Sequence, residues 1–323
     1  MQLIFNFRKG FAPLREGLEA RGCRVLDNLW EPSEAQLKET GACIINFYEG
    51  VRQPWRTWQL KARLKRHGIP LIGIDRDAPW HLGVRRRRLW LFSLFRPLDI
   101  YATHTLQPTL PFAPETIYQA NAAWTRHYHL HGTTLEEMRS PDFFRYDVSF
   151  IGNLDGQRYR EHRARAEFFA ELERRLSGSG INGLFRHAEN LSASDQVDII
   201  QRSRINLNAG AAADHGGERS WGLPERCYGV PACGGFLLSD ERRHARDDFE
   251  PGAEWADFHD MDDCVARIRH FLAHPGEARV IAEAAHLRVL REHTYEHRAE
   301  SLIRHIREWR ENHGPKGRGD IIK

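Results

Sequence analysis

The sequence predicts an α/β protein with two Rossmann-like domains, each built on a mostly parallel sheet. Its 323 residues suffice for two domains of ordinary size. Short apolar segments alternate with amphipathic ones over the first hundred residues, and the alternation begins again at residue 146. Such alternation implies right-handed crossovers between parallel strands, with ligands gathering at the carboxyl ends of those strands.

In the first half, the short apolar runs predict strands and the amphipathic runs between them predict helices. We expect the first domain to occupy residues 1–115. Its predicted strands are Leu3–Phe7, Cys23–Leu26, Ala42–Phe47, Leu71–Ile74 and Ile100–Thr103, and its predicted helices are Leu14–Arg21, Ser33–Thr40 and Trp55–His67.

An irregular stretch follows, in which prolines at positions 108, 111, 114 and 141 interrupt any period. We expect residues 116–145 to pass between the domains, with a short strand at Thr116–Gln119. The second domain is expected over residues 146–292. A C-terminal helix is expected within residues 293–323, and it could pack back on the first domain.

The second half repeats the alternation. Strand Tyr146–Asn153 enters a glycine turn, and strand Phe236–Asp240 follows Gly234 and Gly235. The remaining predicted elements are helices Arg158–Arg175, Ala193–Arg202, Asp262–Leu272 and Gly276–Glu292, a last helix ending near Trp309, strands Gly183–Phe185 and Ile205–Leu207, and the loop Asn208–Ser220.

The composition is that of an ordinary globular protein, with 28% charged and 41% hydrophobic residues. A net charge of +3 gives no argument for binding nucleic acid. The five cysteines include no CxxC pair, so we expect core thiols in a reducing compartment and no zinc site. We find neither a signal peptide nor an apolar run long enough to span a bilayer, and we therefore expect a cytoplasmic protein.

The segment Gly222–Asp240 carries the most specific pattern of the chain. Pro224 suits a first helical turn, where its missing N–H costs nothing, and the two glycines end the helix before an apolar strand. A helix N-terminus that carries Arg226 and follows a Gly-rich turn is well placed to bind a phosphate.

This segment resembles the donor-site segment of nucleotide-sugar glycosyltransferases of the GT-B fold. It is most similar to the spore-maturation-protein-like group, which has a C-terminal domain of the group 1 type. Tyr146–Asn153, Ser203–Asn208 and His293–Arg298 also occur in the family's order. The resemblance implies two facing Rossmann-like domains, with the donor on the second and the acceptor entering from the first. The first half matches only in its strand–helix rhythm.

One position departs from the family's pattern. Where related transferases have a glutamate that holds the ribose of the nucleotide, the chain has Gly229 after Tyr228. Glu225 is the substitute that we consider. The missing carboxylate favours a rival hypothesis, in which the protein kept the fold but serves as a catalytically silent binding or scaffold subunit.

The resemblance implies a donor site that needs no metal and no cofactor besides the co-substrate, a nucleotide diphosphate sugar, with a UDP-sugar as the default. Arg226 is the leading diphosphate ligand, because a guanidinium forms bidentate hydrogen bonds to phosphate. The alternative for Arg226 is that it is a surface arginine on an amphipathic helix. The alternative for the glycines predicted at the donor site is that they belong to ordinary surface loops. The predicted donor-site residues are Gly152, Asn153, Asn208, His215, Gly216, Gly217, Arg219, Glu225, Arg226 and Tyr228.

Glycosyl transfer with inversion requires a base that takes the proton of the acceptor hydroxyl. Asp77 follows a predicted strand in a polar cluster, and Glu49 ends another apolar run. Asp77 is our first candidate for the base and Glu49 the second, with structural ion pairing as the alternative for each. A retaining transfer needs no such base, and the sequence leaves both stereochemical outcomes open.

Four consecutive arginines precede an apolar and aromatic run that ends at Phe95. Such a segment could lie on an anionic membrane surface, or it could bind a phosphorylated or lipid-linked acceptor. The alternative is a helix that covers the sheet with its arginines in solvent. The residues concerned are Arg85, Arg86, Arg87, Arg88 and Trp90.

These patterns together predict a metal-independent glycosyltransferase that moves a sugar from a nucleotide diphosphate sugar to a hydroxyl of a glycan, lipid-linked or protein acceptor. Besides a silent scaffold, the alternative is a phosphate-recognising protein of the membrane surface or of nucleic acid. The overall charge of +3 gives the nucleic-acid reading no support.

Overall fold

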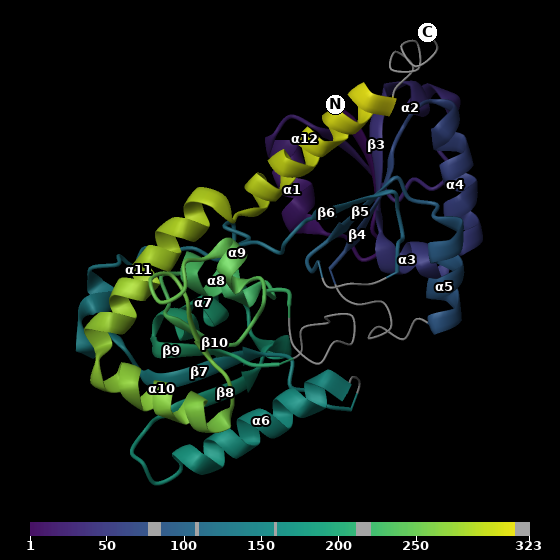
Figure 1. Cartoon of the computed structure of the whole chain (residues 1–323). Coiled ribbons are helices and arrows are strands. Elements are labelled where there is room, and N and C mark those ends of the chain that lie inside the picture. The colour runs from purple at the N-terminus through teal and green to yellow at the C-terminus, as the bar shows by residue number, and fades with distance from the viewer. Residues whose placement is uncertain (77–84, 107–109, 158–159, 211–220, 314–323) are drawn as a thin grey trace. The chain divides into compact units, whose positions relative to one another are not determined.

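The computed structural model describes residues 1–76, 85–106, 110–157, 160–210 and 221–313 (Figure 1). The described chain forms two compact units. The first contains Met1–Ala120 together with the segment from Tyr295 onward, and the second contains the described residues between 121 and 294. Two separate stretches of chain therefore build the first unit.

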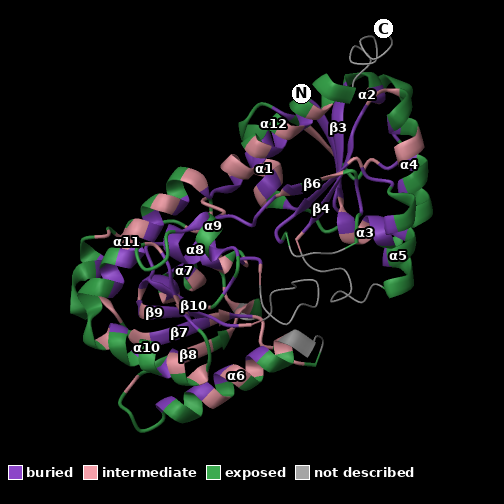
Figure 2. Cartoon of the chain, viewed as in Figure 1, coloured by how far each residue is buried: buried purple, intermediate pink, exposed green. Residues whose placement is uncertain are grey.

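A six-stranded parallel sheet in the order β2-β1-β3-β4-β5-β6 forms the core of the first unit. Most of its strands are buried along nearly their whole length, as expected where helices cover both faces of a sheet (Figure 2). The strands are β1 (Gln2–Asn6), β2 (Arg24–Asp27), β3 (Thr40–Asn46), β4 (Leu71–Asp75), β5 (Ile100–Thr103) and β6 (Glu115–Tyr118), and the helices are α1 (Ala12–Ala20), α2 (Glu34–Glu39), α3 (Phe47–Arg52), α4 (Pro54–Arg66), α5 (Arg86–Phe95) and α12 (Tyr295–His313).

Helix α12 packs on α1 within the first unit. Gly17 permits the close approach, because a Cβ at this position would lie 2.6 Å from the carbonyl oxygen of Tyr295. The rings of Phe11 and Tyr295 meet edge to face with centroids 5.5 Å apart, and Leu18 and Ile306 are fully buried. The last helix of the chain thus covers apolar surface of the first.

The second unit contains a five-stranded parallel sheet in the order β11-β10-β9-β7-β8. Its core joins the sheet to α6, α10 and α11 through residues such as Phe150, Phe169 and Ile281. The strands are β7 (Tyr146–Gly152), β8 (Gly183–His187), β9 (Ser203–Asn208), β10 (Leu237–Asp240) and β11 (Ala256–Phe258), and the helices are η1 (Glu137–Arg139), η2 (Pro141–Phe143), α6 (Arg160–Leu176), η3 (Ala188–Asn190), α7 (Ala193–Gln201), α8 (Arg226–Ala232), α9 (Ala245–Asp248), α10 (Met261–Ala273) and α11 (Pro275–Glu292).

Two parallel sheets confirm the predicted α/β fold class, and two local expectations need correction. The apolar run through Phe47 does not continue as a strand to Glu49, because β3 ends at Asn46 and α3 begins. The Asn46 side chain caps this helix by accepting a hydrogen bond from the N–H of Glu49. The three-residue strand β11 was not expected at all. No helix of the described chain has the length and apolar character that crossing a bilayer requires.

Candidate functional site

Each sheet has a topological switch point, where successive strands diverge to opposite sides. In the second unit the chain places β8 on one side of β7 and β9 on the other. In the first unit it places β2 and β3 on opposite sides of β1. Open parallel sheets bind ligands at the carboxyl ends of the strands that flank such a point. The two candidate sites are therefore the ends of β7 and β9, and the ends of β1 and β3.

Arg226 joins the ends of β7 and β9. It is the first residue of α8, and its Nε and Nη2 donate to the carbonyl oxygen of Ile151 at 3.1 and 2.8 Å. Its Nη1 donates to Oδ1 of Asn208 at 2.8 Å. The side chain is half-buried. The predicted residues Arg226, Asn208 and Gly152 are thus brought together at the switch point.

Gly152 is required at the end of β7 by this arrangement. A Cβ at this position would lie 2.3 Å from Nη2 of Arg226. Any other residue would push the guanidinium away from the carbonyl of Ile151. The glycine therefore makes room for the arginine, a role that the sequence alone did not indicate.

Asp240 ends β10 and organises the next strand end. Its two oxygens accept from Nε and Nη2 of Arg242 at 3.0 and 2.9 Å. They also accept from the backbone N–H of Gly210 at 3.1 Å and from the side-chain amide of Asn208 at 2.9 Å. The Arg242 side chain is fully buried, so its charge is balanced locally by Asp240.

Arg165 adds a third guanidinium to the same edge. It is 5% exposed, and it donates to the carbonyl oxygens of Asn153, Ala209 and Gly210 at 2.9–3.2 Å. Burial, together with the charges of Arg226 and Arg242, lowers the pKa of Arg165 to about 9. Burial is also the main cause that lowers the pKa of Arg226 to about 10.

The strand ends of the second unit therefore carry an excess of positive charge. Three guanidiniums influence one another there, and Asp240 is the carboxylate that opposes both pKa shifts. Lowered pKa values mean that the surroundings disfavour the charged guanidinium, so a bound anion would be favoured. Among the described residues, this arrangement gives the edge of the sheet the chemistry of an anion site.

Sequence reasoning missed Arg165, Asp240 and Arg242 as site residues. One signal was present in α6, where Arg165 shares the buried stripe of Phe169, Leu172 and Leu176. A charged residue on the apolar stripe of a helix needs buried partners. The roles of Asp240 and Arg242 depend on contacts between distant segments, which no local pattern reveals.

The other predicted donor residues differ in their placement. Tyr228 is fully buried and donates its hydroxyl to Asp248, with its ring beside Phe249 and His293, so it lies in the core of the second unit. Glu225 precedes α8 and is exposed. Asn153 follows β7 and is half-buried.

Gly229, which stands where the related transferases have a glutamate, lies under an aromatic ring. A Cβ added to Gly229 would be 3.6 Å from the ring of Tyr128, an ordinary contact distance. The hydroxyl of Tyr128 donates to Gln196, and burial raises its pKa. A side chain at position 229 would therefore begin beside the ring of Tyr128.

Five of the predicted residues lie outside the described part of the chain. These are the predicted base Asp77 and the loop residues His215, Gly216, Gly217 and Arg219.

At the switch point of the first unit, Glu49 and Arg8 lie together. Arg8 follows β1, Glu49 lies in the first turn of α3 after β3, and both carboxylate oxygens accept from the backbone N–H of Arg8 at 3.1 and 3.2 Å. Glu49 is half-buried. By contrast, Asp75 at the end of β4 is buried and accepts a hydrogen bond from Tyr101, whose pKa is raised well above its usual range by burial and by this carboxylate.

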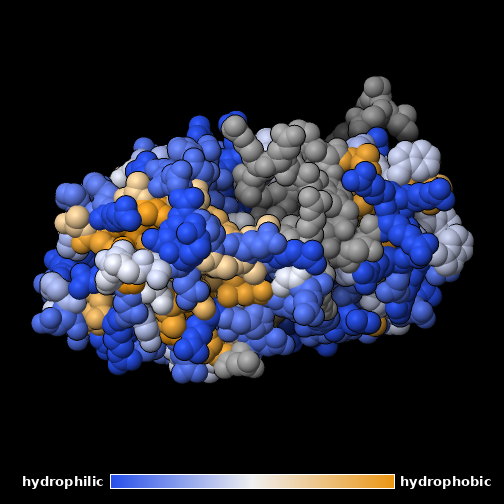
Figure 3. All heavy atoms as spheres, turned by 90° about the horizontal axis from the view of Figure 1, so that it is seen from below, coloured by the Kyte–Doolittle hydropathy of each residue, from blue (hydrophilic) through white to orange (hydrophobic). Residues whose placement is uncertain are grey.

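The predicted arginine run begins α5. Arg85, Arg86, Arg87 and Arg88 are exposed, and so is Trp90 at 58%. The inward face of the helix consists of Leu89, Phe92 and Ser93. On the face seen in Figure 3, hydrophobic residues are likewise exposed among hydrophilic ones, which is normal for scattered positions. Helix α5 differs because Trp90, Leu91, Leu94 and Phe95 follow one another closely, and all are exposed.

Within the described residues, no group of three or more His, Cys, Asp and Glu side chains is arranged to hold a metal ion. The predicted donor-site ligands found at the switch point are a guanidinium, an amide and backbone groups.

A model of the family described as glycosyl transferase-like matches residues 117–304, more than half of the chain. No curated protein matches the chain in sequence. Solved structures match nearly its full length. They include a sucrose-phosphate synthase from Thermosynechococcus elongatus (TM-score 0.66, 11% identity, 95% of this chain and 98% of that one), a glycosyltransferase from Rickettsia africae (0.61, 8%, 96% and 99%) and HepE from Anabaena in complex with UDP and glucose (0.61, 10%, 95% and 100%). At these identities they show a shared fold, and the predicted GT-B fold is confirmed.

Proposed function

Because the chain belongs to the glycosyl transferase-like family, we propose that it transfers a sugar from a nucleotide diphosphate sugar to a hydroxyl acceptor. We also propose its membership of the spore-maturation-protein-like group, on the segments quoted above. HepE has been solved with UDP and with UDP-glucose, which supports a UDP-sugar as the donor. The acceptor class that we propose is a glycan, a lipid-linked or a protein hydroxyl.

The observation that supports this proposal best is the excess of positive charge at the switch point of the second unit. A diphosphate carries the opposite charge and matches the hydrogen-bonding edge of a guanidinium. Three of the five N–H positions of Arg226 hold the ends of β7 and β9 together, so the arginine is fixed before a ligand arrives. Preorganised cations of this kind also stabilise the charge that grows on a leaving nucleotide diphosphate.

Thermal stabilisation by UDP tests the donor site. We expect UDP to raise the melting temperature of the protein, because a ligand that binds only the folded state stabilises it. Arg226→Ala should weaken UDP binding by about tenfold or more, since a charge-assisted hydrogen bond contributes about 1.5–3 kcal/mol. The matched control is Arg269→Ala, which removes an exposed arginine of the same unit. Equal UDP affinity in the wild type and in Arg226→Ala would rule out this arginine as a diphosphate ligand.

We propose that the transfer requires no metal ion, since the predicted diphosphate ligands are cationic side chains and backbone N–H groups. UDP release from UDP-glucose should then continue at its ordinary rate in excess EDTA. A rate that disappears in EDTA and returns with Mg²⁺ or Mn²⁺ would refute metal independence while leaving the donor site in place.

For the base of an inverting transfer, we propose Glu49 from its position at the switch point of the first unit. Asp77, the first candidate from the sequence, lies outside the described residues and is kept here as the alternative. A base has to lie within hydrogen-bond reach of the acceptor hydroxyl, and the carboxyl end of the sheet is where an acceptor is expected.

We further propose that α5 brings a cytoplasmic enzyme to an anionic membrane surface, where lipid-linked acceptors are found. Residues 50–98 contain twelve Lys and Arg but only two Asp, although the whole chain has a net charge of only +3. Basic residues near anionic lipid contribute about 1 kcal/mol each, and exposed Trp, Leu and Phe side chains enter the interface. Five buried, unpaired cysteines support the cytoplasmic location.

A further inference from the structure

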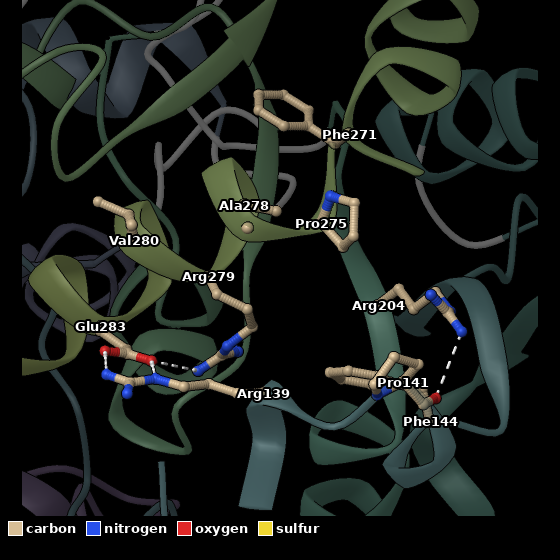
Figure 4. Close-up of a pocket in the computed structure, with 11 residues that line it drawn as sticks. Arg139, Pro141, Phe144, Arg204, Phe271, Pro275, Ala278, Arg279, Val280 and Glu283 are labelled. Atoms are coloured by element: carbon tan, nitrogen blue, oxygen red, sulfur yellow. Dashed lines mark hydrogen bonds and ion pairs between the residues drawn. The ribbon is translucent and has the colours of Figure 1, made fainter. Parts of the chain in front are cut away.

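A cavity lies at the end of the second unit's sheet that is opposite the candidate donor site. It has a volume of about 280 Å³, and its walls come from η1 and η2, the start of β9, the end of α10 and the start of α11 (Figure 4). Arg204 is the second residue of β9, whereas Asn208 of the donor site is its last. The two sites are therefore separated by most of the length of β9, about 13 Å at 3.3 Å per residue.

Arg279 is the buried cation of this cavity. Its side chain lines the cavity although the residue is only 8% exposed. Nη1 donates to the carbonyl oxygen of Gly234 at 2.9 Å, but Nε and Nη2 are buried and have no hydrogen-bond partner among the residues that the structure describes. Glu283 is the nearby carboxylate, 3.9 Å from Nη2. Burial lowers the pKa of Arg279, so its charged form is disfavoured where it stands.

The carboxylate of Glu283 is already engaged by another arginine. Nε and Nη2 of Arg139 donate to its two oxygens at 2.9 and 2.8 Å, and this pairing holds the pKa of Glu283 below its usual range. In Figure 4, Arg139 and Glu283 face each other as a pair, and Arg279 approaches that pair from α11. One carboxylate thus serves two guanidiniums, and the Nε–Nη2 edge of Arg279 is not satisfied.

The rest of the cavity is apolar and aromatic. Phe144 and Pro141 line one side, where Arg204 donates to the carbonyl oxygen of Pro141 at 3.3 Å. Phe271 and Pro275 line another, and in Figure 4 the start of α11 with Ala278 runs between Phe271 and Arg279. Arg204 is paired with Asp147 at 3.4 Å, so its charge is partly balanced.

We propose that this cavity, which we call the Arg279 pocket, binds a small organic acid: a carboxylate attached to an aromatic or aliphatic body. The guanidinium of Arg279 lies at the cavity with its charge only partly balanced by Glu283, so a carboxylate bound in the cavity would balance that charge further. The apolar body then fills the space beside Phe144, Phe271 and Pro275. The volume lies just below the usual range for ligand sites, so the acid must be small.

Benzoate is a suitable probe, and benzyl alcohol is its neutral counterpart of similar shape. We expect benzoate to bind the full-length protein in calorimetric titration at least tenfold more tightly than benzyl alcohol. Saturating UDP should leave benzoate binding unchanged, since the donor site lies at the other end of the sheet. Competition by UDP would place benzoate at the donor site and overturn the proposal.

Two variants locate the binding. Arg279→Met keeps the length and apolar character of the side chain but removes the guanidinium, and it should reduce benzoate affinity to that of benzyl alcohol. Unchanged UDP binding by this variant would show that it is folded. Should it fail to fold, Phe144→Ala removes an apolar wall from an exposed segment and should weaken benzoate binding severalfold. Arg269→Ala is the control. Benzoate binding that survives in the folded variants, or equal binding of benzoate and benzyl alcohol, would overturn the proposal.

Discussion

Glu49 is held in place by the backbone N–H of Arg8, which donates to both of its carboxylate oxygens. If it is the base of the transfer, Glu49→Gln should slow UDP release from UDP-glucose by about a hundredfold, because the amide keeps the shape but cannot take a proton. The affinity for UDP should not change. Glu31→Gln, which alters an exposed glutamate of the same unit, serves as the control.

A structural role for Glu49 predicts the opposite pattern. The variant would then melt at a lower temperature, and the fraction that remains folded would turn over at the normal rate. Normal turnover would remove Glu49 from the mechanism and make Asp77→Asn the next variant to measure.

The candidate site was only partly predictable from individual residues. Arg226, Asn208 and Gly152 were expected from the ends of predicted strands and from the motif that contains them. Arg165 and Arg242 were not, because the carbonyls that they contact, of Ala209 and of Gly222, are distant in sequence. Local patterns reveal which residue ends a strand, but the contacts between strand ends depend on the order of strands in the sheet.

At the scale of elements, α5 exposes large apolar side chains that follow one another closely, including Trp90, Leu94 and Phe95. We expect the protein to sediment with vesicles of phosphatidylcholine and phosphatidylglycerol but not with phosphatidylcholine alone. Leu94→Ser combined with Phe95→Ser should reduce this binding by about tenfold or more, because two large side chains no longer enter the interface.

Leu287→Ser in α11 controls for the general effect of removing an exposed leucine, since Leu94 and Leu287 are both 60% exposed. Equal loss in the control, or equal binding to neutral vesicles, would argue against α5 as an anionic membrane contact.

Most elements were predictable because their apolar residues follow a clear period. Helix α3 was not, since Phe47 continues the apolar run of β3 and the cap at Asn46 gives the weaker signal. Strand β11 contains only three residues, too few to establish an alternation. Parallel pairing followed from the strand–helix rhythm, whereas the strand order came only from the structure.

For the whole molecule, the five cysteines should be inert towards thiol reagents. All are buried, and burial raises the pKa of Cys227 and Cys264 to about 12 and also raises the pKa of the other three thiols. Ellman's reagent at about pH 8 should therefore titrate none of them within minutes, and all five after denaturation. Rapid reaction of a thiol in the native protein would contradict this.

The same shifts give the thiols a defined effect on stability. A thiol whose pKa is higher in the folded state binds more protons when folded, so its contribution is lost as the pH rises above the ordinary thiol pKa of about 8.5. Chemical denaturation between about pH 7 and pH 10 should show the free energy of unfolding decreasing over that range.

The packing of α12 on α1 has a consequence for folding during synthesis on the ribosome. Multidomain chains generally fold from the N-terminus as they are synthesised. Here α1 must wait for α12, because the face of α1 around Gly17 is covered only when α12 appears. The nascent N-terminal half therefore exposes an apolar helix face throughout translation of the second unit, which can complete its own sheet earlier. A stop codon shortly before Tyr295 would spare every strand and still leave the first unit unfinished.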